Sequence, residues 1–560
     1  MKTVRVRRNM FLFVTLTVSF AFWIVSIIQI PLFNYSPDPY WYVRNLPIYY
    51  WIGLTLLVIV VFWYLSTNRT NNVKIDLPVV LLFVLYLFGT IDFVTVTPYF
   101  MDIYARIAEI NVVSQLGTIT TPVALTHADT PGSIIFFAIL KLVVGNDLFE
   151  AFVKFYDIFI LTILSVFVYI IARRLPISRK ALIAPIAFLS LAVFMEFHID
   201  RQSFALALFS VLLFLTFGLL KSSRIQWSVM FTVAFTTLAF SHPGTPLIFL
   251  GGLVFAILVT DLPWFRSQMA THRKNLMYLI FAGLAIYLAW SIYFSAAYPW
   301  FVANTLFIWS SLTHLLGGRI NLSPETIQSP SQLMGSVLIL REMQYVLLVS
   351  VGLFSTIYLF SKKSWNKTLL LAGLIGFDLL LEVLLFAGHA NVERGFLHML
   401  FPVSILCALA FETSTKKRSI LLGLLSAILI LSMILLPITS YGGNLPIETP
   451  SSSEVSAANF ASQYLPNGTY LTGFYHGGLF SERIFLGSLR VEAWSGQSIS
   501  QLPANCSLLI TNENYDYYSL RFGSTKDYAN LEDEALTSFD RVCDSGLARI
   551  YISTNSSKGP

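Results

Sequence analysis

Charge is scarce in this chain: Asp, Glu, Lys and Arg make up 12% of its 560 residues, whereas 56% are hydrophobic. A soluble domain of ordinary composition carries about twice this share of charged residues. The composition therefore excludes an ordinary soluble protein and indicates a chain that spans a membrane. The formal net charge of +6 concerns membrane orientation, which Lys and Arg in loops determine, and we expect no nucleic-acid partner.

Cysteine and the common soluble motifs are also rare or missing. Of three cysteines, Cys407 lies in an apolar run and is predicted to be inert packing. Cys506 and Cys543 lie in the polar C-terminal region, where a disulfide is possible if that region is exported. The chain has no GxxxxGK[ST] loop, HExxH, CxxC pair or GxSxG elbow, so ATP-driven and zinc-hydrolase functions have no support.

Long apolar runs dominate the first 440 residues. Fourteen candidates lie at 10–30, 48–66, 76–97, 133–145, 151–172, 181–197, 203–220, 227–241, 246–260, 275–296, 342–360, 368–388, 395–411 and 419–438. The run 133–145 is the shortest and would cover about 20 Å as a helix, less than the hydrocarbon core of roughly 30 Å. We therefore expect this run to lie in the interface and not to cross.

The basic loops support this count. If 133–145 does not cross, every strongly basic connection falls on the side of the N-terminus, as the positive-inside rule requires. The sequence thus predicts an all-α polytopic plasma-membrane protein with about thirteen transmembrane helices and a cytoplasmic N-terminus. Residues 1–75 would form two spans and 76–440 the core, with an outer loop at 98–150 that holds an interfacial helix. Residues 441–560 would form a small extracytoplasmic α/β domain, with strand-like runs at 470–475, 507–511 and 548–553.

In this topology, polar side chains gather in the outer connections. Carboxylates, imidazoles and guanidiniums at one membrane face suit chemistry on a phosphate-bearing lipid. The alternative is that loop ends are polar simply because water and headgroups surround them. The residues concerned are Asp102, Arg106, His127, Asp129, His198, Arg201, His242, His314, Arg319, Glu325, His389, Glu393 and Arg394.

Acidic residues within the spans raise a different possibility. Asp92, Asp157, Asp378 and Glu382 lie within or near apolar runs, and the last two share a helix face at i, i+4 spacing. Ionisable residues in a membrane are costly and often functional, including in proton-coupled transport. A transporter, or a flippase for lipid-linked glycans, is therefore the alternative function.

A sequence of features in the first outer loop resembles a known enzyme group. Asp102-Ile-Tyr-Ala-Arg106 follows a span, then come Gly117, the Pro-started helix of Thr130–Gly145 and a span that ends in Tyr169–Leu175. This order resembles the core of the GT-C superfamily, multispanning glycosyltransferases that use polyprenyl-phosphate sugars on the extracytoplasmic face. Protein mannosyltransferases, oligosaccharyltransferase catalytic subunits and lipid A aminoarabinose transferases belong to it.

The resemblance implies roles for particular residues. Asp102 matches the acidic residue that acts as catalytic base or metal ligand in the family, and a divalent cation (Mg or Mn) is a possible cofactor. Arg394, His242 and Arg201 are expected to bind the carrier phosphate, and the wider substrate-binding set is Arg106, His127, Asp129 and Glu393. The partners would be a polyprenyl-phosphate-linked sugar, a glycan, lipid or protein acceptor, and membrane lipids.

The chain departs from the family pattern in three places. Two extra spans precede the Asp102 loop, and the Trp-Trp-Asp motif of oligosaccharyltransferases is missing. The second acid of the usual acidic pair is absent because Ile103 follows Asp102, and either Glu109 or Asp129 is a candidate to replace it. A polymerase or ligase of lipid-linked glycans and a non-catalytic envelope scaffold also remain open.

Overall fold

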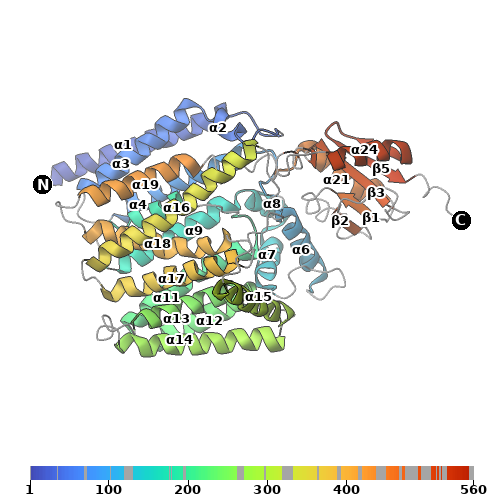
Figure 1. The fold of residues 1–560 in the computed structure, drawn as a ribbon. Coiled ribbons are helices and arrows are strands. Elements are labelled where there is room, and N and C mark those ends of the chain that lie inside the picture. Colours follow the sequence, from blue (N-terminus) through green and yellow to red (C-terminus); the bar gives the residue numbers. More distant parts are fainter. Residues whose placement is uncertain are drawn as a thin grey trace.

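The computed structural model consists of a bundle of long helices with a small α/β domain at one end (Figure 1). Hydrocarbon offers no hydrogen-bond partners, so apolar segments that cross it fold as helices, which pair their own backbone groups. The structure describes residues 2–34, 36–67, 72–100, 102–118, 130–175, 177, 180–192, 197–222, 224–260, 270–294, 298–317, 332–361, 365–387, 393–413, 419–436, 449–465, 469–472, 490–493, 506–512, 514–515, 519 and 526–553.

Most bundle helices coincide with the apolar runs of the sequence. They are α1 (Lys2–Gln29), α3 (Ile48–Thr67), α4 (Val73–Val84), α5 (Thr90–Val94), α9 (Tyr156–Arg174), α10 (Ile183–Ser190), α11 (Arg201–Lys221), α12 (Ile225–Ser241), α13 (Thr245–Thr260), α14 (Ala270–Ala289), α16 (Gln332–Ser361), α17 (Trp365–Ala387), α18 (Glu393–Thr413) and α19 (Ser419–Leu436). A π-helical segment, η1 (Leu85–Gly89), joins α4 to α5, and η2 (Trp290–Phe294) follows α14.

Eight helices within the described residues are long and apolar enough to cross a membrane. The chain is therefore an integral membrane protein, as its composition predicted. The count of thirteen spans and the orientation of the termini stay predictions.

Three shorter helices occupy the predicted outer loop: α6 (Asp102–Leu116), α7 (Gly132–Val144) and α8 (Asn146–Lys154). Figure 1 shows α7 lying crosswise to the bundle helices, at the end nearest the C-terminal domain. That the run 133–145 does not cross the membrane stays a prediction. A short helix, α2 (Trp41–Asn45), lies between α1 and α3 in the chain.

Part of the segment 297–341, which lies between the predicted runs 275–296 and 342–360, is helical. It contains a 19-residue helix, α15 (Tyr298–Leu316), and α16 begins at Gln332, well before the predicted run 342–360. Asn304 and His314 interrupt the apolar residues of α15. Because the apolar run is broken, hydropathy alone does not predict this helix.

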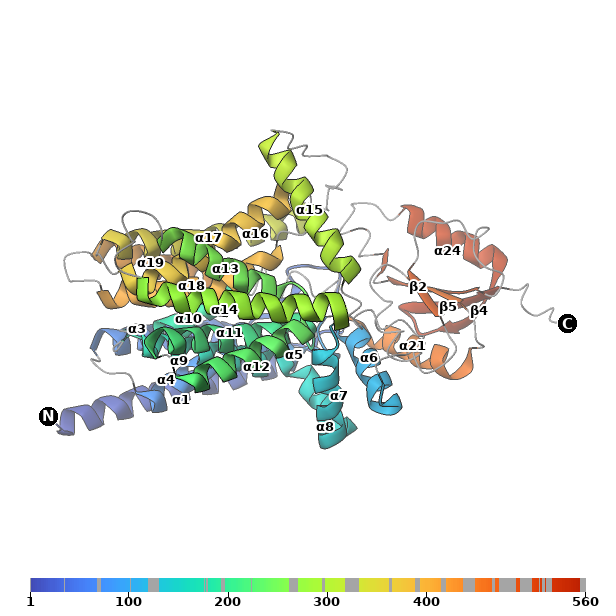
Figure 2. The ribbon, with the colours of Figure 1, turned by 90° about the horizontal axis from the view of Figure 1, so that it is seen from below.

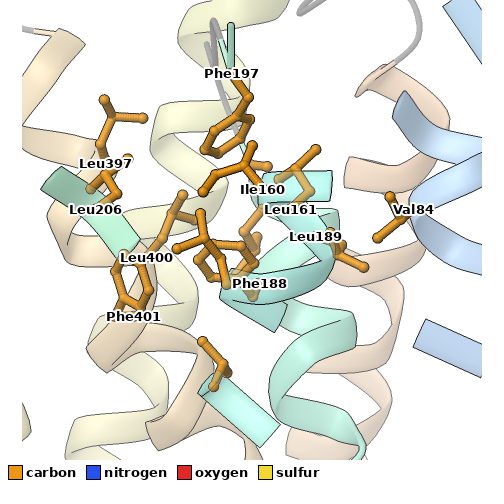
Figure 3. Packing of buried hydrophobic residues seen from close by; sticks show 14 of the residues in the cluster. Val84, Ile160, Leu161, Phe188, Leu189, Phe197, Leu206, Leu397, Leu400 and Phe401 are labelled. Carbon is orange, nitrogen blue, oxygen red and sulfur yellow. The ribbon is translucent and has the colours of Figure 1, made fainter. Parts of the chain in front are cut away.

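The bundle core is packed around α10. All eight residues of α10 are buried, and Figure 3 shows Phe188 and Leu189 among side chains such as Ile160, Leu206 and Phe401, which come from α9, α11 and α18. The described helix ends at Ser190, so it is shorter than the predicted span of 181–197, of which residues 193–196 lie outside the described part.

Helices α13 and α17 pack closely through glycines. A Cβ atom at Gly373 would lie 2.6 Å from Cβ of Ala256, and one at Gly252 would lie 2.3 Å from a methyl carbon of Leu374. Small residues permit this approach, which supplies dispersion contacts where lipid tails remove the hydrophobic driving force between helices.

The C-terminal domain is an α/β unit with a five-stranded sheet in the order β2-β1-β3-β5-β4. Its elements are α21 (Ser452–Tyr464), β1 (Thr469–Thr472), β2 (Arg490–Ala493), β3 (Cys506–Thr511), α24 (Lys526–Ser538), β4 (Phe539–Asp544) and β5 (Ala548–Ser553). Strand β1 runs parallel to β2 and β3, whereas β5 is antiparallel to β3 and β4. Strands β1, β3 and β5 match the three strand-like runs of the sequence.

The sheet order excludes the disulfide that the sequence left open. Strand β5 lies between the strand of Cys506 and the strand of Cys543. Adjacent strands are about 4.8 Å apart, so the two Cα atoms are separated by at least about 9.6 Å, beyond the reach of a bridge at about 7 Å. Cys543 is a free thiol, and burial together with the nearby Asp544 raises its pKa.

The α13–α17 packing gives a stability prediction. Gly373→Val should lower the free energy of unfolding by about 1–3 kcal/mol, because the added carbons overlap Ala256. Gly423→Val in α19 is the matched control, since its Cβ would meet no described atom within 4 Å. Thermal unfolding in detergent compares the two variants, and equal melting temperatures would contradict the packing described here.

Candidate functional site

Asp102, the predicted catalytic residue, is the first residue of α6 and is exposed. The backbone just before it is strained: Phe100 has a φ of +76°, a conformation that costs a bulky residue about 1–3 kcal/mol. The buried Phe100 ring is held against Tyr99, with centroids 4.0 Å apart, and against His198 at 5.4 Å. Packing thus determines the direction in which the chain enters α6.

His198 belongs to the turn that leads into α11. Asp200 caps this helix, since its carboxylate accepts a hydrogen bond from the backbone N–H of Gln202, and its Oδ2 lies 4.0 Å from Nε2 of the buried His198. Arg201, the first residue of α11, donates from Nη1 to Oγ1 of the buried Thr130 at 3.2 Å. The turn 197–201 therefore connects the Asp102 loop with the segment that starts α7.

The start of α7 rests on the end of α12. A Cβ atom at Gly132 would lie 2.3 Å from Oγ of Ser241, so only glycine fits there without a shift of that side chain. The next residue after Ser241 is His242, one of the predicted phosphate ligands. Thr130, Arg201 and His242 are thereby brought to one region, although they come from three distant parts of the sequence.

The His242 ring is oriented by its own turn. Its Nδ1 accepts hydrogen bonds from the backbone N–H groups of Gly244, at 3.2 Å, and Thr245, at 3.0 Å. In a neutral ring the proton therefore lies on Nε2, which can donate to an anionic oxygen. The Thr245 hydroxyl lies 3.1 Å from Nδ1 of His242 and 3.2 Å from Nε2 of the buried His398, so α18 joins the same chain of contacts.

Glu393 and Arg394 lie in the first turn of α18, and His398 follows Arg394 by one helical turn. Several predicted residues lie outside the described part of the chain: His127, Asp129, Arg319, Glu325 and His389. The structure describes the backbone of Glu393 and Arg394 but not their side chains. His314 lies in α15, and its side chain is likewise not described. The backbone alone therefore places Arg394 near His398.

Arg106 has a different environment from the other predicted ligands. Its Nη1 lies 2.7 Å from Oε2 of Glu109, and the exposed fractions of the two side chains are 18% and 4%. Glu109, a candidate for the missing second acid, thus compensates the charge of Arg106. The Asp102 carboxylate makes no hydrogen bond or ion pair with any other described residue, so no described side chain joins it directly to Arg201 or His242.

Metal ligands do not gather in the described part of the chain. No three His, Cys, Asp or Glu side chains of the described residues lie close enough together to hold a metal ion. The divalent cation that the resemblance implies stays a prediction, and the mechanism proposed below contains no step on a metal.

The linker to the C-terminal domain is attached beside the Asp102 loop. Thr97 donates from its hydroxyl to the carbonyl of Pro450 at 2.8 Å, and Asn34 accepts from the N–H of Ser452 at 2.9 Å. Phe33 and Thr95 form a parallel β-bridge next to these contacts. Figure 2 shows α21 beside α6, so the domain lies over the end of the bundle that carries the candidate site.

Sequence reasoning missed two members of this site. His398 lies inside the apolar run 395–411, which the sequence predicts to be a span, although its i, i+4 spacing from Arg394 indicates a shared helix side. Thr130 is uncharged, and only its contact with Arg201 identifies it.

The comparisons with known proteins are limited to structure. No family model matches the chain, and no curated protein matches it. Among solved structures it is similar to ArnT from Cupriavidus metallidurans in the apo state, with 12% sequence identity, coverage of 91% of this chain and 99% of that chain, and a TM-score of 0.46. A likeness at this identity and TM-score carries no argument about the family or the activity of this chain.

The Arg106–Glu109 pair gives a prediction about stability. Arg106→Gln should lower the free energy of unfolding by about 2 kcal/mol or more, because it leaves the buried Glu109 carboxylate without its counterion. Arg44→Gln is the matched control: Arg44 also lies 2.7 Å from a carboxylate, that of Asp38, but is 67% exposed, and should cost less than about 1 kcal/mol. Unfolding in detergent measures both, and an equal loss would show that burial does not distinguish the pairs.

Proposed function

We propose that this protein is a membrane glycosyltransferase that moves a sugar from a polyprenyl-phosphate carrier to an acceptor at the face covered by the C-terminal domain. The observation that supports it best is the continuous chain of contacts at that end of the bundle. The contacts run from Phe100, two residues before Asp102, to His198, and from Arg201 through Thr130 and Gly132 to the turn of His242, while Asp102 itself joins them only through the backbone. These residues supply a carboxylate, a guanidinium and an imidazole beside a membrane surface, which is the set that transfer from a lipid phosphate needs.

Asp102 is the proposed base. Its exposed carboxylate at the start of α6 would accept the proton of the acceptor hydroxyl while the acceptor oxygen bonds to the anomeric carbon. The bond from that carbon to the carrier phosphate breaks at the same time, on the opposite face of the sugar. The products are the glycosylated acceptor with inverted configuration, the carrier phosphate and a protonated Asp102, which returns its proton to water.

Arg201, His242 and Arg394 are the proposed phosphate ligands. The leaving phosphate gains negative charge as the bond breaks, so donors aimed at its oxygens lower the barrier. Arg201 is the first residue of α11 and Arg394 is the second residue of α18, and the planar guanidinium of an arginine matches the oxygens of a phosphate. His242 would donate from Nε2, because its Nδ1 is occupied as an acceptor.

The C-terminal domain is the proposed acceptor-binding or capping unit. Its linker is hydrogen bonded to Thr97 and Asn34, and Thr97 precedes Asp102 by five residues. An acceptor held by the domain would therefore reach the carboxylate without crossing the bundle. In the predicted topology this face is extracytoplasmic.

The proposal is tested by sugar transfer with Asp102→Asn. Purified protein in lipid is given radiolabelled polyprenyl-phosphate sugars and a membrane extract as acceptor. We expect the variant to lose at least about 100-fold in rate, the usual contribution of a general base, with thermal stability unchanged because Asp102 contacts no described partner.

Asp147→Asn is the matched control, since Asp147 is also an exposed acid at the start of a helix, α8. It should keep the wild-type rate. Equal transfer by the wild type and Asp102→Asn would remove Asp102 from the mechanism. Transfer by neither, with intact donor, would argue against the glycosyltransferase proposal.

Transport is the second candidate, and one observation favours it. Asp378 and Glu382 are buried in α17, 2% and 5% exposed, one helical turn apart. A proton-coupled transporter should lose gradient-driven uptake of lipid-linked glycan in proteoliposomes when Asp378→Asn is introduced. If that variant keeps full sugar transfer and the wild type shows no dependence on a proton gradient, transport is contradicted.

A further inference from the structure

A large basic cavity lies at the end of the bundle opposite the candidate site. It has a volume of about 640 Å³, and its lining includes Arg174, Lys221, Arg224, Trp227, Phe217 and Leu370. Arg174 and Lys221 are the last residues of α9 and α11, and Arg224 precedes α12. Since α11 starts at Arg201 and rises 1.5 Å per residue, its last residue is about 30 Å from the site described above.

One of the three cations is held in place by aromatic rings. The guanidinium carbon of Arg174 lies 3.8 Å from the ring centroid of Phe214 and 4.8 Å from that of Trp227. The Trp227 ring in turn packs on Gly218, where a Cβ atom would lie only 2.9 Å away. Stacking of this kind orients the planar fork of an arginine, which suits it to bind a phosphate.

The positive charge of the cavity is not compensated within the described part of the chain. No carboxylate among the described residues lies within salt-bridge distance of Arg174, Lys221 or Arg224, and none of the lining residues is acidic. Three like charges around one cavity repel each other, so an anion that binds there lowers the electrostatic repulsion among the three side chains.

An exposed apolar stripe continues from the cavity along α12. Ile225, Val229 and Val233 are exposed, and their i, i+4, i+8 spacing places them on one side of the helix, starting at the residue after Arg224. A soluble anion would not contact this stripe. The acyl chains of a lipid whose headgroup binds in the cavity would lie along it.

We propose that this cavity binds an anionic phospholipid, with the headgroup phosphate between Arg174, Lys221 and Arg224 and the acyl chains along the exposed stripe of α12. In the predicted topology the lipid belongs to the cytoplasmic leaflet, where basic pockets between helices recognise anionic headgroups. The site is separate from the proposed transferase centre and does not depend on it.

The test measures how many lipids the full-length protein retains in native mass spectrometry. The probes are phosphatidylglycerol and phosphatidylcholine with identical acyl chains, so that only the headgroup charge differs. We expect wild type to retain phosphatidylglycerol at least about fivefold more strongly, and the pair Lys221→Gln and Arg224→Gln to lose this preference.

A control pair removes the same charge at the same end of the bundle. Lys74 and Arg173 are exposed there and do not line the cavity, so Lys74→Gln with Arg173→Gln should keep the preference within about twofold. Equal loss in both pairs would assign the effect to the general positive charge of this face and overturn the site.

Two further outcomes would also overturn the proposal. A wild type without preference for phosphatidylglycerol has no anionic lipid site. Binding of inorganic pyrophosphate by lipid-free wild type, lost in the Lys221 and Arg224 pair, would assign the cavity to a soluble anion. Unchanged elution and melting temperature of the variants show that any loss reflects binding and not misfolding.

Discussion

Hydrocarbon accepts no unpaired backbone group, and the rest of this structure depends on that constraint. Each segment that crosses must be helical and mostly apolar, because an unsatisfied polar group within the membrane costs several kcal/mol. Polar side chains capable of chemistry are consequently confined largely to helix ends. The two ends of the bundle differ in their side chains. The end under the C-terminal domain carries acids, imidazoles and arginines, and the other end carries cations around a cavity.

The end of the bundle beneath the C-terminal domain is organised by contacts between elements that are remote in the chain. Short helices such as α7 lie crosswise there (Figure 2), and the absence of a side chain at Gly132 lets α7 begin directly on Ser241. This contact between α7 and α12 brings Thr130 to Arg201 and places both next to the turn of His242. Strain at Phe100 and the buried His198 determine where Asp102 begins its helix. The same surface holds the linker of the α/β domain through Thr97 and Asn34, so any substrate bound by the domain would meet this group of residues.

Aromatic and small residues have complementary tasks in the bundle. Glycines let α13 and α17 approach to contact distance, which replaces the hydrophobic driving force that is missing between helices in lipid. Rings instead orient polar groups, as Phe214 and Trp227 do for Arg174. Both tasks depend on exact geometry between helices, so neither is apparent from a run of apolar letters.

The sequence by itself determined the membrane class, the positions of most helices and the strands β1, β3 and β5. These follow from local hydropathy, from run length against bilayer thickness and from alternation within a strand. Only the tertiary structure decided that Arg106 is paired with Glu109, that His398 and Thr130 belong with His242 and Arg201, that residues 298–316 are helical, and that β5 separates Cys506 from Cys543. The Arg106–Glu109 pair and the helix 298–316 are local features. The other features depend on packing between segments far apart in the chain. Composition and spacing along one segment contain no information about which distant segment it will meet.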